Sequence, residues 1–153
     1  MNIEDLEQIA QSRGVDRLAV AASADVDRHL PEHRRLAHIA RHLPRVVVLA
    51  RHMPNGVMWA GHPGTKQYAA ARSLKMLGEV AVHLAAAIEA VGAAAMPLAP
   101  VAIDFEASGA AELTPAGQGP LVARVAAVQA GLGTHGLNTM VLTQAFGPRV
   151  HFA

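Results

Sequence analysis

The spacing of hydrophobic residues along the chain predicts three main helices. Apolar side chains recur every three or four positions within each segment, which places them on one face of a helix. The segments are Ile3–Ala10, Thr65–Val91 and Leu121–Gln129. The glycines that can end these helices in a left-handed conformation are Gly14, Gly92 and Gly131. Between the first two helices, Asp25–His42 is charged and contains Pro31, so it predicts only partial helix.

Runs of apolar and β-branched residues predict the strands. The clearest is Arg45–Arg51, whose continuous RVVVLAR run is typical of a strand buried on both faces. The other predicted strands are Arg17–Ala22, Ala93–Leu98, Thr139–Thr143 and Arg149–Phe152. The last two flank the turn-forming residues 144–148 and therefore predict a hairpin. This alternation over residues 1–153 predicts a single α/β (α+β) domain, a sheet with helices on both faces.

Composition narrows the classes of function. Hydrophobic residues make up 52% of the chain and charged residues 16%, which indicates a folded domain. The net charge of +1 gives no electrostatic reason to expect nucleic acid or an anionic membrane as a partner. The acidic, amphipathic N-terminus is unlike a signal peptide, and no apolar run reaches the roughly eighteen residues of a membrane span. We therefore expect a cytoplasmic protein.

The residue types available for chemistry are restricted. The chain has no cysteine, which excludes disulfides, thiolate nucleophiles and cysteine-held zinc or iron–sulfur sites within it. His29 and His33, and likewise His38 and His42, lie four positions apart, a spacing at which two side chains on a helix can share a metal. Pro31 interrupts the first pair and arginines surround both, so we interpret them as solvated surface residues.

The glycine-rich loop at 131–136 matches the dinucleotide pattern G-x-G-x-x-G letter for letter. That pattern binds a pyrophosphate when a strand enters it and a helix leaves, because the helix N-terminus then faces the phosphates. Here a predicted helix enters and a predicted strand leaves, and no acidic residue follows about twenty positions later. We therefore reject a dinucleotide site. One structural interpretation stays open, in which the glycines only close the helix onto the hairpin.

The same region carries a different resemblance. Arg124, the AGLG of Ala130–Gly133, Gly136, Asn138 and the TQAFGPRV of Thr143–Val150 resemble the corrinoid-binding module of epoxyqueuosine reductases and reductive dehalogenases. Weaker collinear similarity extends upstream through Leu43–Arg51, Tyr68 and Ala90–Gly92. The resemblance implies a three-layer nitroreductase-like sheet flanked by helices, with cobalamin as the cofactor.

The resemblance also implies a site. Cobalamin would bind between the loop at Gly131–Asn138, the hairpin Thr139–Phe152 and the loop around His62. Glycines would allow close approach of the ring, while Arg124 and Asn138 would hold its amides or its phosphate-bearing tail. The expected cofactor-binding residues are Arg124, Gly131, Leu132, Gly133, Thr134, His135, Gly136, Asn138, Thr139, His62 and Tyr68. His135 is also the candidate axial ligand of the cobalt, since neutral imidazole is a common metal ligand.

Departures from the family pattern limit the expected activity. Gly117 stands where epoxyqueuosine reductases have an aspartate acting as general acid, and the cysteines of the iron–sulfur domain are missing. We therefore expect a stand-alone cobalamin-binding domain that acts as a corrinoid carrier, a sensor or a subunit of a redox enzyme. If the protein is an enzyme, it is a cobalamin-dependent reductase that receives electrons from a separate iron–sulfur or flavin protein.

Two alternative functions remain open, and a second copy of the chain is an expected partner. The chain could be a small FMN-dependent nitroreductase-like reductase, with Arg72, Lys75 and Arg124 holding the flavin phosphate. It could also be a scaffold without a cofactor, which works through protein contacts over its apolar surface. A homodimer is a further expectation, because nitroreductase-like folds usually dimerise around flavin.

Overall fold

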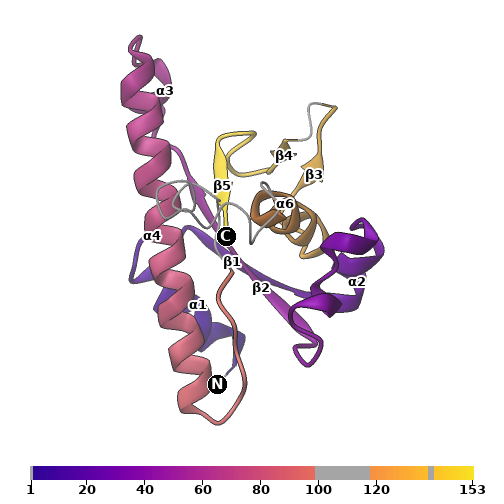
Figure 1. Ribbon diagram of the computed structural model, residues 1–153. Helices are drawn as coiled ribbons and strands as arrows, with labels where there is room; N and C mark the ends of the chain where they lie inside the picture. Colours follow the sequence, from indigo (N-terminus) through magenta and orange to yellow (C-terminus); the bar gives the residue numbers. More distant parts are fainter. Residues whose placement is uncertain (1, 99–117, 138–139) are drawn as a thin grey trace, which may run out of the picture.

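The sheet at the centre of the fold has three antiparallel strands. The computed structural model describes residues 2–98, 118–137 and 140–153 (Figure 1). The strands are β1 (Arg17–Ala22), β2 (Arg45–His52) and β5 (Val150–Phe152), in the order β1-β2-β5. A separate two-stranded ribbon joins β3 (Thr134–His135) to β4 (Val141–Leu142). The chain is therefore a mixed α/β protein with small antiparallel sheets.

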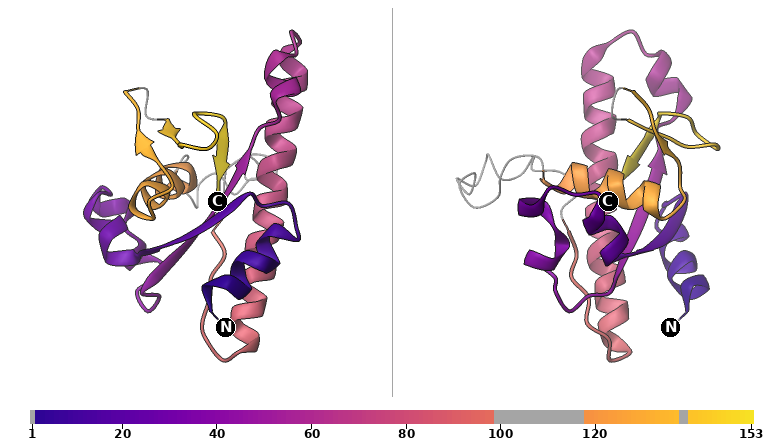
Figure 2. Two further views of the ribbon diagram at one scale, coloured as in Figure 1. Left: turned by 180° about the vertical axis from the view of Figure 1, so that it is seen from behind. Right: turned by 90° about the vertical axis from the view of Figure 1, so that its right-hand side faces the viewer.

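Helices cover both faces of the three-stranded sheet (Figures 1 and 2). One face carries α1 (Ile3–Gln11) and α4 (Pro63–Ala90), and the other carries α2 (Ser23–Arg28) and α6 (Gln118–Gln129). The remaining short elements are η1 (Glu32–Arg34), η2 (Leu36–His38) and α3 (Asn55–Trp59). No helix within the described ranges has the length and apolar character needed to cross a membrane.

Strand β2 contributes to the core on both sides. Val48 and Ala50 belong to the cluster shared with α2 and α6, while Leu49 belongs to the cluster shared with α1 and α4. This alternation follows from the pleat, which points successive side chains to opposite faces. Leu49 is only 2% exposed. The prediction that RVVVLAR is a strand buried on both faces is therefore confirmed at its centre.

Strand β5 pairs with only the last part of β2. Its register places Phe152 opposite Ala50 and Val150 opposite His52. Ala153 continues the ladder, because its N–H donates to the carbonyl of Leu49 at 3.0 Å and its carbonyl accepts from the Leu49 N–H at 2.8 Å. Val150 and Phe152 pack into the α2–α6 side of the core. This short pairing ties the end of the chain to the sheet.

Local signals explain the helix ends. Asn2 and Asp5 form a capping box at the start of α1, with two hydrogen bonds of 2.8 Å between each side chain and the other residue's backbone N–H. Pro63 stands in the first turn of α4, where its missing N–H costs nothing. The predicted helices near the N-terminus, over Thr65–Val91 and over Leu121–Gln129 are confirmed.

One predicted strand and one predicted pairing of strands are wrong. Residues 93–98 form no strand, since three alanines and Pro97 offer little to a sheet. The predicted hairpin between Thr139–Thr143 and Arg149–Phe152 does not form either. Instead β4 pairs with β3, and β5 pairs with β2. Pairing β5 with β2 buries Val150 and Phe152 in the core, which a solvent-exposed hairpin would not do.

Burial in the central strand predicts that two leucine-to-alanine substitutions differ strongly in their effect on the free energy of unfolding. We expect Leu49→Ala to lower the free energy of unfolding by about 2–5 kcal/mol, because it leaves a cavity between β2 and α4. Leu137→Ala, at a fully exposed side chain, should change it by less than about 0.5 kcal/mol. Urea denaturation measures both values, and equal effects would contradict the description of the core.

Candidate functional site

The glycine turn after α6 is built by the end of that helix. Ala130 N–H donates to the carbonyl of Ala126 at 2.8 Å, and Leu132 N–H donates to that of Ala127 at 2.9 Å. Gly131 lies between them with φ +77°, a left-handed conformation that glycine adopts without strain. No other atom lies within 4 Å of the position that a Cβ would take at Gly131, so this turn leaves free space beside it.

The turn that precedes β5 is held by hydrogen bonds of a single threonine. Thr143 and Gly147 exchange two backbone hydrogen bonds of 3.0 and 2.8 Å. The Thr143 hydroxyl also donates to the Gly147 carbonyl at 3.1 Å and accepts from the Phe146 N–H at 3.0 Å. Gly147 has φ +61°, which this tight turn requires. The four bonds fix the direction in which residues 144–146 project.

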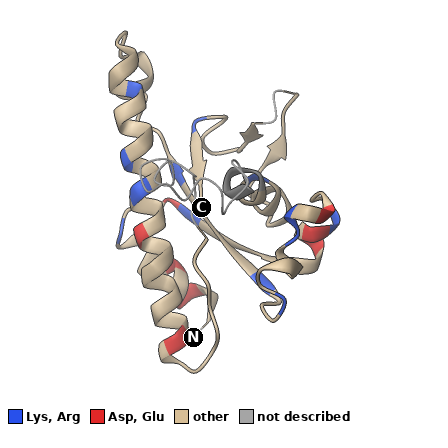
Figure 3. Cartoon of the chain, viewed as in Figure 1, with Lys and Arg blue, Asp and Glu red and all other residues tan. Residues whose placement is uncertain are grey.

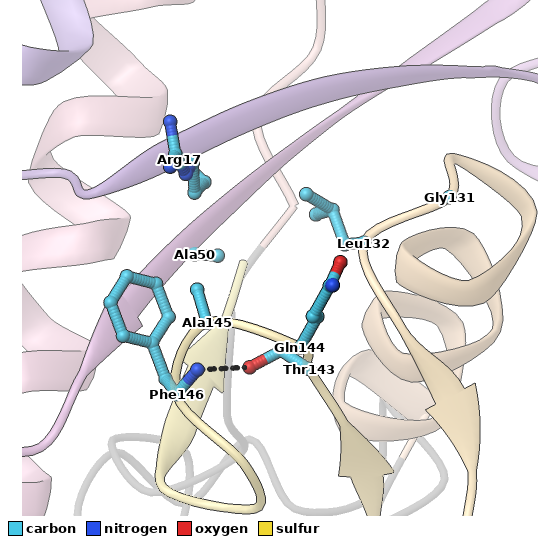
Figure 4. A pocket seen from close by; sticks show the side chains of 8 residues that line it. All are labelled: Arg17, Ala50, Gly131, Leu132, Thr143, Gln144, Ala145 and Phe146. Atoms are coloured by element: carbon cyan, nitrogen blue, oxygen red, sulfur yellow. Dashed lines mark hydrogen bonds between the residues drawn. The ribbon is translucent and has the colours of Figure 1, made fainter.

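These two turns and the end of the sheet enclose an open cleft of about 360 Å³. Figure 4 shows Arg17 and Phe146 on one side of it, with Leu132 and Gln144 on the other. Its lining residues are Arg17, Ala50, Gly131, Leu132, Thr143, Gln144, Ala145 and Phe146. The cleft therefore combines a guanidinium, a carboxamide and a hydroxyl with aromatic and aliphatic contact surface.

A histidine–aspartate pair lies beside this cleft. The backbone N–H of His52 donates to Oδ2 of Asp16 at 2.8 Å, and its Nδ1 lies 3.0 Å from the same oxygen. Because a carboxylate only accepts, Nδ1 is the donor in this bond, which leaves Nε2 for other partners. The imidazole stacks on Phe146, with ring centroids 5.0 Å apart and planes 13° from parallel. Asp16 thus sets the orientation of an aromatic pair at the edge of the cleft.

Of the predicted site residues, Gly131 and Leu132 line the cleft. Gly133 serves another purpose, since a Cβ there would overlap the backbone carbonyl of Leu142 and lie 2.9 Å from the Val141 side chain. Gly136 closes the β3–β4 ribbon by donating its N–H to the Met140 carbonyl at 2.8 Å. At Gly133 the fold itself therefore favours glycine, because a larger residue would meet the Leu142 backbone. This agrees with the structural interpretation, in which the glycines close the helix onto the following strands.

The other predicted residues lie elsewhere. Thr134 and His135 form the exposed strand β3 and do not line the cleft. His62 caps α4, and Tyr68 lies in its second turn, at an end of the helix that stands away from β3 and β4 (Figures 1 and 2). Arg124 is half-buried on α6 and does not line the cleft. Asn138 and Thr139 lie outside the described residues. The described residues that were predicted to form a groove with the loop around His62 therefore do not lie together.

Several cleft residues were not among those predicted. Arg17 and Ala50 reach the site only because β1 and β2 pair in register, Arg17 opposite Ala50. Asp16 and His52 meet for the same reason, since Asp16 directly precedes Arg17 and His52 lies two residues after Ala50. One signal was present in the sequence. The TQAF residues 143–146 belonged to the resemblance and do line the cleft.

A second, larger cavity of about 680 Å³ is lined mainly by apolar residues. It extends between α1, the second half of α4, strand β2 and α6, next to residues 93–98, and none of the predicted site residues line it. Among the described residues, no group of three or more histidine, aspartate or glutamate side chains could hold a metal ion. The 360 Å³ cleft remains the place where predicted residues and polar groups converge.

The comparisons with known proteins return no match. No protein-family model matches the chain, and neither a curated protein nor a solved structure matches it significantly. The corrinoid resemblance therefore depends on the motif residues alone.

The two loop glycines predict different responses to alanine. Gly133→Ala should lower the free energy of unfolding by about 1–3 kcal/mol, because its Cβ would force the Leu142 backbone to shift. Gly131→Ala adds its methyl to open space and costs only the left-handed strain, about 1–2 kcal/mol. Thermal unfolding measures the loss of stability, and the two-dimensional NMR spectrum shows whether the backbone near Leu142 has shifted. Displaced Val141 and Leu142 amides in Gly131→Ala, but not in Gly133→Ala, would contradict it.

A half-buried histidine on β5 predicts a pH dependence of stability. Burial lowers the pKa of His151 below its ordinary value of 6.5, and the charge of Arg51 lowers it further. The unfolded chain therefore binds the proton first, so stability is full above about pH 6.5 and falls as the pH drops towards the folded-state pKa. We expect the His151→Gln variant to lose less stability than the wild type between about pH 7 and pH 5.

The matched control for this measurement is His42→Gln, at an exposed position outside the sheet. Urea denaturation at several pH values should give this control the slope of the wild type. An unchanged slope in the His151→Gln variant would show that His151 does not carry the effect.

Proposed function

We propose that this protein is a stand-alone corrinoid-binding domain with a nitroreductase-like three-layer arrangement, and that the 360 Å³ cleft receives the cofactor. One observation supports this proposal above the others. The AGLG and TQAF segments of the resemblance are separated by nine residues in the chain, yet residues 131–132 and 143–146 line the same cleft. Two independent parts of one motif thus meet at a single place.

The chemistry of the cleft fits part of such a cofactor. Its volume lies within the roughly 300–1,000 Å³ of small-molecule sites, and it would take one edge of the flat macrocycle with the remainder lying outside. Leu132, Ala145 and Phe146 offer apolar contact to the ring. Gln144 can pair with its amide arms, and Arg17 with an amide carbonyl or the phosphate of its tail.

The roles of individual residues differ from those implied by the resemblance. Gly131, rather than Gly133, allows the close approach, because only the former has open space beside it. His135 does not line the cleft and is not part of the proposed site. When bound, the corrinoid would supply cobalt-centred redox chemistry, with electrons from a separate iron–sulfur or flavin protein. The chain itself binds and orients the cofactor.

The FMN alternative receives less support. Its proposed phosphate ligands were Arg72, Lys75 and Arg124. The first two lie on α4 and the third on α6, and these helices cover opposite faces of the sheet. Three cations separated by a sheet cannot close on one phosphate group, so the corrinoid proposal is preferred.

Titration with hydroxocobalamin, followed by absorption spectroscopy, tests the proposal, with FMN and haem as competing probes. We expect the corrinoid bands to shift with the wild-type protein and no retention of FMN. Ala145→Trp fills the cleft from an exposed position and should weaken cobalamin binding about tenfold or more, equivalent to at least about 1.4 kcal/mol.

Ala24→Trp is the control, since Ala24 is an exposed residue of α2 outside the cleft. His135→Ala should bind as the wild type does. Absence of a band shift, or equal affinity of the Ala145→Trp and Ala24→Trp variants, would refute the proposed site.

A further inference from the structure

The outward face of helix α4 combines exposed apolar and charged side chains. All residues from Gly61 to Tyr68 are exposed, so the side chains at the start of this helix are open to solvent. Tyr68 is 69% exposed and Val82 is 54% exposed. These two apolar side chains flank a run of charged residues on the same helix, and such a charge pattern can select a partner.

The exposed residues share one side of the helix. Ser73, Leu77, Val80 and Leu84 face the core, and the opposite side carries the surface residues at three- and four-residue spacing. We call this the α4 outer stripe, and it consists of Tyr68, Arg72, Lys75, Glu79, Val82 and Ala86. Among the described residues, neither Lys75 nor Glu79 has an ion-pair partner. The stripe therefore holds charges as well as apolar groups that are free to meet a partner.

Charge is distributed unequally along α4. Lys66, Arg72 and Lys75 lie in its first half, whereas Glu79 and Glu89 lie in its second half. The acidic α1 lies beside that second half, so its carboxylates add to the same end (Figure 3). A helix that is basic at one end and acidic at the other is complementary to itself when a second copy runs antiparallel.

We propose that two copies of this chain associate through the α4 outer stripe, with the helices antiparallel about a two-fold axis level with residue 77. In such an interface each contact occurs twice, because residue i meets j and j meets i. The axis places Lys75 against Glu79 of the second copy. It also places Tyr68 level with Ala86, and the aliphatic stem of Arg72 over Val82.

Neighbouring registers are less favourable. An axis level with residue 75 would place Lys75 against its own copy, and an axis level with residue 79 would do the same for Glu79. Like charges in direct opposition are destabilising. The charges thus select one register, and the second copy is the partner to which the stripe is matched. This inference is independent of the proposed cofactor, since the cleft residues lie outside the stripe.

Charge reversal with sedimentation equilibrium tests the interface. We expect the wild-type chain to dimerise, and Lys75→Glu or Glu79→Lys alone to weaken the dimer about tenfold or more, because each creates two like-charge contacts. The double variant, and an equimolar mixture of the two single variants, should recover the wild-type affinity. Recovery on mixing also demonstrates that both single variants are folded.

Arg41→Glu is the matched control, since it makes the same charge change at an exposed residue outside α4 and should leave the dimer unchanged. A wild-type chain that remains monomeric at about 0.5 mM would overturn the proposal. The proposal would equally fail if the mixture of single variants associated no better than either variant alone.

Discussion

The fold depends on burying both faces of strand β2 at once. Val48 and Leu49 are neighbours in sequence, yet they belong to two separate core clusters on opposite sides of the sheet. Neither α4 nor α6 could pack stably without the sheet, because each must bury an apolar face to offset its loss of conformational entropy. The rest of the architecture is arranged around this one strand, which both β1 and β5 pair with directly.

The candidate site follows from the same constraint. Because β5 pairs only with the last residues of β2, the turn at 143–147 is placed over the end of the sheet and opposite the glycine turn of α6. Asp16 and His52 then meet at the adjoining edge, and His52 stacks on Phe146. The cleft is thus a consequence of strand register, which brings together residues that are far apart in the chain. Its lining combines polar side chains with apolar contact surface.

Local patterns predicted much of the fold but little of the site. The helical period of α4 was sufficient to predict that helix, and the RVVVLAR run was sufficient to predict strand β2, because both patterns are strongly apolar. The hairpin prediction failed because adjacency in sequence cannot reveal that β5 gains more burial beside β2. Arg17 in the cleft and His52 beside it were missed because only the β1–β2 register brings them to this place. His135 lies outside the cleft. Its position between two glycines did not indicate the direction in which its side chain points.

We propose that the cleft beside β2 receives a corrinoid. Amide chemical shifts recorded during addition of hydroxocobalamin locate the contact directly on the folded protein. We expect changes confined to Arg17, Ala50, residues 131–132 and residues 143–146. Changes centred on His135 or Tyr68 with the cleft amides unaffected, or no changes at all, would contradict it.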